Sequence, residues 1–164
     1  MNDASTSKAS ELRAQDIMTK PVWCADENWT VDKLASFLFD HGISGAPVVG
    51  NNGGLVGVVS LTDVVRLEGI AEKLRAGGSA RGFYAKHLDE KLSREHIEQL
   101  NAQGVAKLKV RDIMANDVVS VSPTDSVKRV AQVMHERRVH RVIVASPDEA
   151  LGVISTMDLL PFVS

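Results

Sequence analysis

The sequence predicts an α/β (α+β) fold of two pseudo-symmetric βαββα repeats that pack through their sheets, with a helical insertion between them. Two internal matches support this fold. Asp16-Ile17-Met18 recurs 96 residues later as Asp112-Ile113-Met114, and Gly57-Val58-Val59-Ser60-x-x-Asp63 recurs 95 residues later as Gly152-Val153-Ile154-Ser155-x-x-Asp158. Two matches in the same order and at nearly the same spacing indicate a tandem duplication. Such a duplication usually leaves a cleft between its halves, where we expect the functional site.

The composition is that of an ordinary globular protein and argues against several functions. The chain has 164 residues, 44% of them hydrophobic, and a formal net charge of −2. The slight negative charge disfavours a general nucleic-acid surface or an anionic-membrane surface. The single cysteine, Cys24, allows no internal disulfide and favours a reducing compartment. No apolar run approaches the ~20 residues that cross a bilayer, so we expect a cytoplasmic protein that binds neither nucleic acid nor membrane.

The first repeat is predicted at residues 12–66, after a polar tail at 1–11 that we expect to be disordered. Apolar residues at the i, i+3, i+4, i+7 spacing follow Thr30, a suitable N-cap, and Gly42 suits the C-terminal end of that helix. The Asn-Asn-Gly-Gly sequence at 51–54 favours a tight turn between two strands. The predicted elements are a helix at 12–19, strands at 22–24, 46–49 and 55–59, and helices from Val31 and Ser60.

The second repeat, at residues 109–164, repeats this order. Its apolar helix positions 127, 130, 131 and 134 match 31, 34, 35 and 38 of the first repeat after a shift of 96. The predicted elements are a helix at 110–115, a strand at 118–121, a helix capped by Thr124 or Asp125, strands at 141–145 and 151–154, and a last helix from Ser155 that Pro161 cuts short.

Residues 67–108 form the predicted insertion between the repeats. The Gly77-Gly78-Ser79 sequence breaks it. Tyr84, Leu88 and Leu92 then recur every four residues, which predicts one or two amphipathic helices. We interpret this segment as a candidate contact surface for a partner. The alternative is that it only extends the helix pair and covers the edge of a dimer.

The Ser-x-x-Asp sequence that ends both long matches has two compatible interpretations. As a structural feature, it resembles a helix N-terminus in which the Asp complements the helix dipole. As a functional feature, a helix N-terminus with a serine hydroxyl suits a phosphate, and the carboxylate can accept hydrogen bonds from both hydroxyls of a ribose. A single copy favours the structural interpretation, but a cap residue can also bind a ligand.

Together these sequences resemble a tandem pair of CBS domains, also called a Bateman module, in the family named after cystathionine β-synthase. The resemblance covers about residues 12–66 and 109–162. It rests on both Asp-Ile-Met sequences, both Gly-x-x-Ser-x-x-Asp sequences, Ile43-Ser44-Gly45-Ala46-Pro47-Val48-Val49 and Val139-His140-Arg141-Val142-Ile143-Val144. The resemblance implies that an adenosine-containing ligand binds in the cleft between the two repeats.

The resemblance also implies roles for individual residues. The family's Asp holds the ribose and its Ser or Thr reaches the phosphates, while adenine meets the backbone of the first strand of a repeat. Carried over to this chain, the ribose residues are Asp63 and Asp158, the phosphate residues are Ser60, Thr62 and Ser155, and the adenine pocket lies near Val22 and Val119.

His140 and Arg141 are further phosphate candidates. A His-Arg pair at this position resembles one in the gamma subunit of AMP-activated protein kinase, where it contacts phosphates, and the planar arginine donors match phosphate oxygens. The structural alternative is a solvated basic end of a helix, which the helix dipole favours. The first repeat has Ser44-Gly45 at this position, so the two sites are expected to be unequal.

We therefore hypothesise a stand-alone regulatory module that binds AMP, ADP, ATP, NAD or S-adenosylmethionine and signals to a regulated enzyme or transporter through the shape of a homodimer. The apolar helix face with Leu34, Leu38, Val130 and Met134 is the predicted dimer contact. The histidine and cysteine spacings do not indicate a metal site, and we expect neither catalysis nor a catalytic cofactor. The main alternative is a ligand-free dimerisation or scaffold module. A weak nucleotide hydrolase and a nucleic-acid binder are further alternatives.

Overall fold

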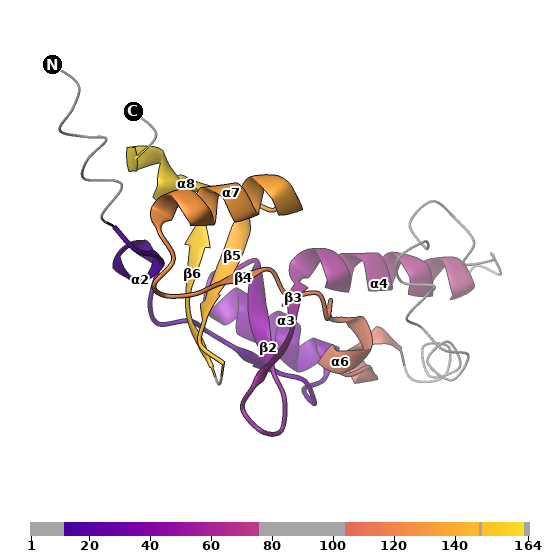
Figure 1. Cartoon of the computed structure of the whole chain (residues 1–164). Coiled ribbons are helices and arrows are strands. Elements are labelled where there is room, and N and C mark those ends of the chain that lie inside the picture. The colour runs from indigo at the N-terminus through magenta and orange to yellow at the C-terminus, as the bar shows by residue number, and fades with distance from the viewer. Residues whose placement is uncertain (1–11, 76–103, 148, 163–164) are drawn as a thin grey trace, which may run out of the picture. The chain divides into compact units, whose positions relative to one another are not determined.

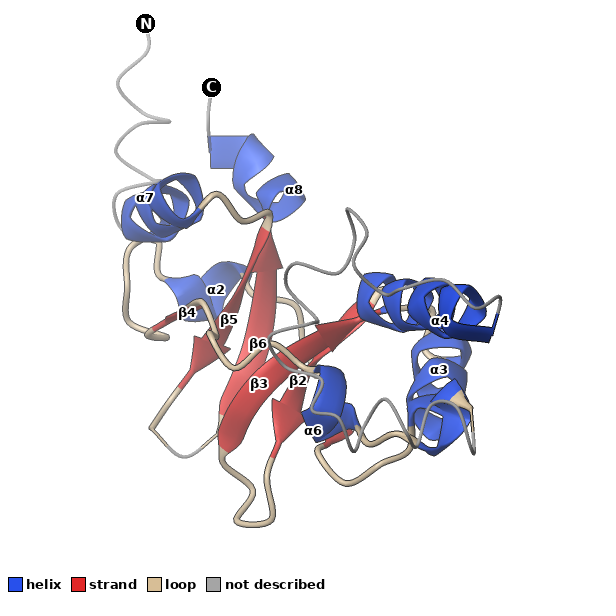
Figure 2. Ribbon diagram, turned by 90° about the vertical axis from the view of Figure 1, so that its right-hand side faces the viewer, coloured by secondary structure: helices blue, strands red, loops and turns tan. Residues whose placement is uncertain are grey.

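Two three-stranded sheets organise the part of the chain that the computed structural model describes, residues 12–75, 104–147 and 149–162 (Figure 1). The strand orders are β1-β2-β3 and β4-β5-β6, and helices flank the strands (Figure 2). The predicted α+β class is confirmed. The strands are β1 (Ala25–Asp26), β2 (Gly45–Val49), β3 (Leu55–Ser60), β4 (Ser120–Val121), β5 (Arg141–Ala145) and β6 (Ala150–Ser155).

The helices follow the same order in both repeats. None of the helices within the described residues is both long enough and apolar enough to span a membrane. The helices predicted around Tyr84 to Leu100 lie outside the described residues. The described helices are α2 (Ala14–Ile17), α3 (Val31–Asp40), α4 (Leu61–Arg75), α6 (Val110–Ile113), α7 (Val127–Arg137) and α8 (Thr156–Leu159), with 3-10 turns η1 (Val105–Lys107) and η2 (Leu160–Phe162).

The caps of the two central helices confirm one prediction and correct another. The Thr30 hydroxyl accepts a hydrogen bond from the Lys33 N–H at 3.3 Å, as expected of an N-cap. In α7 the cap is Ser126, whose hydroxyl accepts from the Arg129 N–H at 3.2 Å. The predicted cap, Thr124 or Asp125, is therefore wrong, because the Asp125 carboxylate instead accepts from the Ser122 N–H at 2.8 Å, in the preceding turn.

The parallel strand pairs have the same register in both repeats, and they explain why the position predicted for the first strand is wrong. Ala25 pairs with Val48 in β1–β2, and Val121 pairs with Val144 in β4–β5, each residue shifted by 96. The first strand was predicted at 22–24, but it lies at Ala25–Asp26. A two-residue strand has no alternation of its own, so pairing with β2 sets its position.

The spacing between the repeats changes from 96 to 95 residues in a hairpin loop. The loop from 50 to 54 joins β2 to β3, whereas the shorter loop from 146 to 149 joins β5 to β6. The β5–β6 pairing is antiparallel and its register shifts between Val144 and Ala145. One residue fewer in the second loop therefore accounts for the two spacings seen in the sequence.

The chain divides into two compact units that do not coincide with the two sequence repeats. Among the described residues, unit 1 comprises residues 12–23, 53–55, 118–147 and 149–162, and unit 2 comprises residues 24–52, 56–75 and 104–117. Unit 1 thus combines the sheet of the second repeat with α2 from the start of the first. Unit 2 combines the sheet of the first repeat with α6 from the start of the second. We call α2 and α6 the Asp-Ile-Met helices, because each contains or adjoins that sequence.

Backbone hydrogen bonds attach each Asp-Ile-Met helix to the sheet of the other repeat. In unit 1 the Thr19 N–H donates to the Val153 carbonyl at 2.9 Å, and the Val153 N–H donates back at 3.3 Å. In unit 2 the Ala115 and Val58 backbones exchange the equivalent bonds at 2.8 and 2.9 Å. Each repeat therefore contributes its Asp-Ile-Met helix to the sheet of the other repeat in the same way.

A methionine from each Asp-Ile-Met sequence packs against the glycine of the other repeat's Gly-x-x-Ser-x-x-Asp sequence. A Cβ atom at Gly152 would lie 2.6 Å from the Met18 Sδ. A Cβ atom at Gly57 would lie 2.7 Å from the Met114 Sδ and 2.8 Å from the Ala115 carbonyl oxygen. Because real Cβ atoms do not approach this closely, a larger residue would force Met18 to move at Gly152 and would also clash with backbone at Gly57. In each unit, therefore, the Asp-Ile-Met sequence of one repeat packs against the Gly-x-x-Ser-x-x-Asp sequence of the other.

Each unit has its own apolar core, and these cores correct the predicted dimer contact. Leu34 and Leu38 are fully buried in unit 2, and Val130 and Met134 are buried in unit 1. The prediction that this helix face is uncovered is wrong, because residues of the same unit's sheet and Asp-Ile-Met helix cover it. The core of unit 2 also takes in Leu67, Ala71, Val105 and Leu108, from the described ends of the predicted insertion.

Replacing Gly57 by alanine should destabilise the protein by about 1–3 kcal/mol, because the added Cβ overlaps Met114 and the Ala115 carbonyl. Gly69→Ala is the matched control. No atom lies within 4 Å of a Cβ at Gly69, and removing glycine from a helix should stabilise it by up to about 1 kcal/mol. Urea unfolding of both variants measures the difference. Equal free energies of unfolding would show that the methionine–glycine contact is not tight.

Candidate functional site

The start of α8 brings a serine and an aspartate of unit 1 into direct contact. The Asp158 Oδ2 accepts hydrogen bonds from both the Ser155 N–H and the Ser155 hydroxyl, each at 2.7 Å. The last residue of β6 is Ser155, and Asp158 lies in the first turn of the helix. The Ser-x-x-Asp spacing therefore produces a closed serine–carboxylate pair at the junction of strand and helix.

The same arrangement is present at the start of α4 in unit 2. The Asp63 Oδ2 accepts from the Ser60 N–H and the Ser60 hydroxyl, each at 2.8 Å. Both pairs are half-buried. The structural interpretation of the Ser-x-x-Asp sequence, as a helix N-terminus stabilised by its aspartate, is thus correct in both repeats.

This hydrogen bonding limits how the serines could act. A hydroxyl has one proton to donate, and here that proton goes to the aspartate. To donate to a phosphate, the hydroxyl of Ser60 or Ser155 must first rotate away from its carboxylate. That rotation would also release part of the carboxylate for another donor, such as a ribose hydroxyl. The two ligand roles predicted for each pair are therefore linked.

In unit 1 the basic pair lies beside this serine. Arg141 and Ser155 are partners in the β5–β6 register, and the His140 carbonyl accepts from the Thr156 N–H at 3.0 Å. The imidazole and the guanidinium are both exposed. The structure thus brings together His140, Arg141, Ser155 and Asp158, four of the residues predicted from the sequence.

In unit 2 the corresponding position is a tightly packed glycine, Gly45, in place of an arginine. The Ser44 carbonyl accepts from the Leu61 N–H at 2.9 Å, as in unit 1. A Cβ at Gly45 would lie 3.0 Å from the Val59 carbonyl oxygen and 3.3 Å from the Ser60 Cβ. The predicted inequality of the two repeats therefore has a steric basis as well as a difference in charge.

The remaining predicted residues lie near these pairs in sequence or in the sheet. Thr62 is exposed in the first turn of α4, beside Asp63. Val119 directly precedes β4, and its carbonyl accepts from the Ile143 N–H at 3.1 Å. Val22 is half-buried between α2 and β1 rather than inside a strand. The adenine roles of Val22 and Val119 stay predictions.

An open pocket of about 780 Å³ lies in unit 1, between the C-terminal end of α7 and the start of α8. The two helices are also adjacent in Figure 1. Of the residues predicted to bind a ligand, His140 lies in the lining of this pocket. The basic end of α7 was recognised in the sequence, but its position beside a pocket depends on α8 and leaves no local pattern. The lining residues are Ala131, Met134, His135, Glu136, Arg138, Val139, His140, Thr156 and Leu159.

Neither a metal centre nor a reactive thiol emerges from the described residues. No group of three or more His, Cys, Asp or Glu side chains within them could hold a metal ion. Cys24 is half-buried, and burial raises the pKa of its thiol above the ordinary value. A protonated thiol is a poor nucleophile, so this cysteine is unsuited to catalysis in the folded chain.

The comparison with protein families identifies the class of the chain. The model of the CBS domain matches residues 14–69 and 110–164. These two matches cover more than half of the sequence. The chain therefore belongs to the CBS domain family, as the sequence resemblance predicted.

The chain is similar to two uncharacterised proteins of Methanocaldococcus jannaschii. One is 26% identical over 159 residues, which make up 96% of this chain but 42% of that protein. The other is 28% identical over 149 residues, which make up 89% of this chain and 88% of that protein. The chain thus spans less than half the length of the first of these relatives.

Solved structures of CBS domains share the fold. The CBS domain of a membrane protein from Sphaerobacter thermophilus is 28% identical, with a TM-score of 0.71 over 98% of this chain and 93% of that one. A CBS domain pair solved with 5′-methylthioadenosine and S-adenosyl-L-methionine is 21% identical, with a TM-score of 0.60 over 91% and 93%. CBSX2 in complex with AMP is 20% identical, with a TM-score of 0.62 over 90% and 92%.

The raised pKa of Cys24 predicts slow alkylation of the folded protein. At a fixed pH below the thiol pKa, the folded chain has a smaller thiolate fraction than the unfolded chain. Iodoacetamide at pH 8 should therefore label Cys24 more slowly in buffer than in urea, with mass spectrometry as the readout. The labelling rate of the folded chain should rise with pH beyond the point where the unfolded rate levels off. Equal rates would contradict the burial of this thiol.

Proposed function

We propose that this chain is a regulatory module that binds an adenosine-containing ligand and transmits binding to a partner protein. The observation that carries the proposal is the cluster of His140, Arg141, Ser155 and Asp158 at one end of the unit 1 sheet. It combines a carboxylate, a hydroxyl and basic side chains on adjoining elements. A nucleotide needs these same groups for its ribose and its phosphates.

In this proposal Asp158 binds the ribose. Its Oδ2 is occupied by Ser155, and a carboxylate has about four lone-pair sites over two oxygens. Ribose hydroxyls can use the remaining sites, or replace the Ser155 hydroxyl. Charge-assisted hydrogen bonds of this kind are about twice as strong as neutral ones.

The phosphate part of the ligand is assigned to His140, Arg141 and the Ser155 hydroxyl. The arginine side chain starts opposite Ser155 in the sheet, and its planar donors can bind two phosphate oxygens at once. The corresponding set in unit 2 is Ser60, Thr62 and Asp63, beside Ser44 and Gly45. We therefore assign the stronger site to unit 1 and a weaker one to unit 2.

The ligand class draws support from related structures. One similar CBS domain pair was solved with 5′-methylthioadenosine and S-adenosyl-L-methionine, and CBSX2 with AMP. These ligands share adenosine and differ in charge. The common part supports an adenosine-containing ligand for this chain, with AMP, ADP, ATP, NAD and S-adenosylmethionine as the set to test.

We further propose that the module is non-catalytic, cytoplasmic and homodimeric. Its helices expose large apolar side chains at equivalent places in the two repeats. Val65 of α4 is 68% exposed, and Leu160, its counterpart 95 residues later, is 57% exposed. Phe39 and Met157 are also exposed. A ligand that binds one dimer arrangement better than another would shift the dimer toward that arrangement, and a regulated enzyme or transporter could respond to it.

Thermal unfolding against the five ligands tests the proposed class. A ligand that binds only the folded chain adds RT ln(1 + [L]/Kd) to its stability. At millimolar ligand, at least one of the five should raise the melting temperature by several degrees. No shift for any of them would favour the alternative, a ligand-free dimerisation or scaffold module.

Asp158→Ala should weaken binding of that ligand at least tenfold, because the loss of hydrogen bonds to a charged acceptor costs about 1.5–3 kcal/mol. The variant should also lose about 1 kcal/mol of stability as its helix terminus loses an acceptor. Asp125→Ala is the matched control. Asp125 accepts a backbone N–H at the same distance range in the same unit, but it lies outside the proposed site. Calorimetry that finds equal affinities in the two variants would remove Asp158 from the site.

The homodimer predicts that charge on the exposed helix residues disrupts association. Val65→Glu together with Leu160→Glu should shift the protein toward the monomer, because dimerisation would then bury two carboxylates in each chain. Lys128→Glu, at an exposed position of α7, is the control and should leave the dimer intact. Analytical ultracentrifugation gives the two dissociation constants. Identical sedimentation of both variants as dimers would place the contact elsewhere.

A further inference from the structure

Arg138 has a left-handed backbone conformation, which is unfavourable for residues other than glycine. It ends α7 in the left-handed region, with φ 52° and ψ 44°. Among the described residues it is the only non-glycine residue with positive φ. The equivalent residue of the first repeat is Gly42, with φ 61°. Glycine adopts this conformation without cost, whereas other residues lose of order 1 kcal/mol. The second repeat keeps an arginine where glycine fits the backbone better.

Arg138 is one of the residues that line the open pocket between α7 and α8. Two further basic residues, His135 and His140, line the same pocket, and all three are exposed. A residue with a strained backbone in the lining of a pocket points to a function for its side chain. The shared property of these three side chains is that they can donate hydrogen bonds to an anion.

The first repeat shows that this basic character is a local change rather than a general feature of the fold. The residues equivalent to His135, Arg138 and His140 are Phe39, Gly42 and Ser44. The two copies share their backbone at this point, including the left-handed residue. They differ in every one of these three side chains. Only the copy in unit 1 has basic side chains at these three positions.

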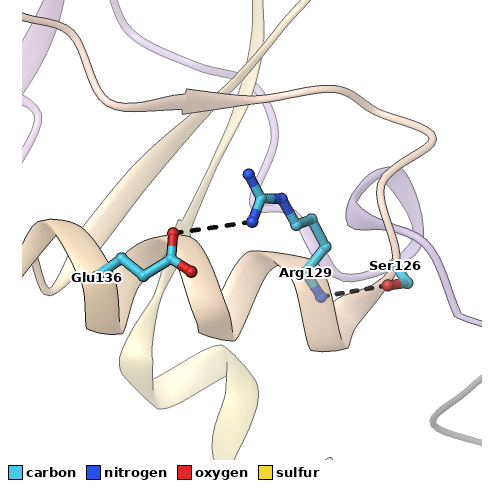
Figure 3. Close-up of polar contacts among 3 residues, drawn as sticks. All are labelled: Ser126, Arg129 and Glu136. Carbon is cyan, nitrogen blue, oxygen red and sulfur yellow. Dashed lines mark hydrogen bonds and ion pairs between the residues drawn. The ribbon is translucent and has the colours of Figure 1, made fainter.

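The acidic residue of the pocket is paired with another group. Glu136 lines the pocket, and its carboxylate forms an ion pair with Arg129 at 3.8 Å. Figure 3 shows that the Glu136 side chain runs back along α7 toward Arg129, whose backbone N–H donates to the Ser126 cap. The Glu136 carboxylate is thus directed toward the start of α7, away from Arg138 and His140, which follow the end of the helix.

We propose that this pocket binds the phosphate chain of a nucleoside di- or triphosphate, and that Arg138 selects such ligands over a monophosphate. The proposal rests on the nucleotide function proposed above and specifies the ligand class of the unit 1 site. His140 belongs both to the proposed site with Ser155 and Asp158 and to the lining of this pocket. A nucleotide whose ribose lies at Asp158 could therefore extend its phosphates into the pocket. His135 in the last turn of α7 and Arg138 directly after the helix both line this pocket. His135 and Arg138 can thus meet successive phosphates, which a monophosphate does not have.

The test compares the affinities of AMP, ADP, ATP and inorganic tripolyphosphate for the full chain by calorimetry. The main variant is Arg138→Gly, which places in the second repeat the residue that the first repeat has. Glycine accepts the left-handed conformation, so this variant should unfold at the same temperature or higher. Arg137→Gln is the matched control, because it removes the same charge one position away, outside the pocket lining.

Arg138→Gly should weaken ADP, ATP and tripolyphosphate about tenfold, as expected from the loss of charge-assisted hydrogen bonds, and AMP less than about threefold. The Arg137→Gln variant should bind all four probes within about twofold of the unchanged protein. Equal effects of the two variants, or an equal loss for AMP and ATP, would overturn the proposal.

Asp158→Ala separates a failure of this proposal from a failure of the nucleotide function. If Asp158→Ala weakens AMP and ATP alike while Arg138→Gly changes neither, the nucleotide function stands and the role of Arg138 is refuted. If no adenosine ligand binds but tripolyphosphate binds and depends on Arg138, the pocket takes a phosphate chain and the nucleotide function is refuted. If none of these four probes binds and none of the five adenosine ligands raises the melting temperature, both proposals are overturned.

Discussion

The close contact between a methionine side chain and a glycine backbone is the constraint on which both units depend. Met18 lies against Gly152, and Met114 against Gly57, at distances that leave no room for a Cβ atom. Beside each contact, paired backbone hydrogen bonds attach the Asp-Ile-Met segment to the sheet. Because each methionine comes from the other repeat, the core of neither unit is complete without both halves of the sequence.

The candidate site follows from this packing. Gly57 and Gly152 lie three residues before the serines that end β3 and β6, so the contact that positions each strand also positions its serine–aspartate pair. The backbone at these pairs is alike in both units, down to the distances. Their chemistry differs through a few neighbouring side chains. Gly45 is packed tightly against Ser60 and carries no side chain, whereas Arg141 lies opposite Ser155.

The sequence predicted the elements whose pattern is local and failed where the answer depends on distant parts of the chain. The periodicity of α3 and α7 and the turn at 51–54 identified helices and a hairpin correctly. The position of β1 was wrong because a two-residue strand takes its register from β2. The apolar face of Leu34 and Val130 was recognised, but periodicity does not tell what covers a face. The Ser-x-x-Asp pairs were found from repetition, whereas the left-handed Arg138 leaves no pattern in one sequence.

The exchange of the Asp-Ile-Met helices has a consequence for how such a chain could arise. If the helix of a single repeat packed as it does here, that repeat would complete its core with the helix of another molecule, and its folding would depend on protein concentration. Fusion of two copies turned that association into an intramolecular step with a high effective concentration. Once both copies lay on one chain, each could change without its twin. A glycine could then become an arginine in one half while the other half kept the original backbone.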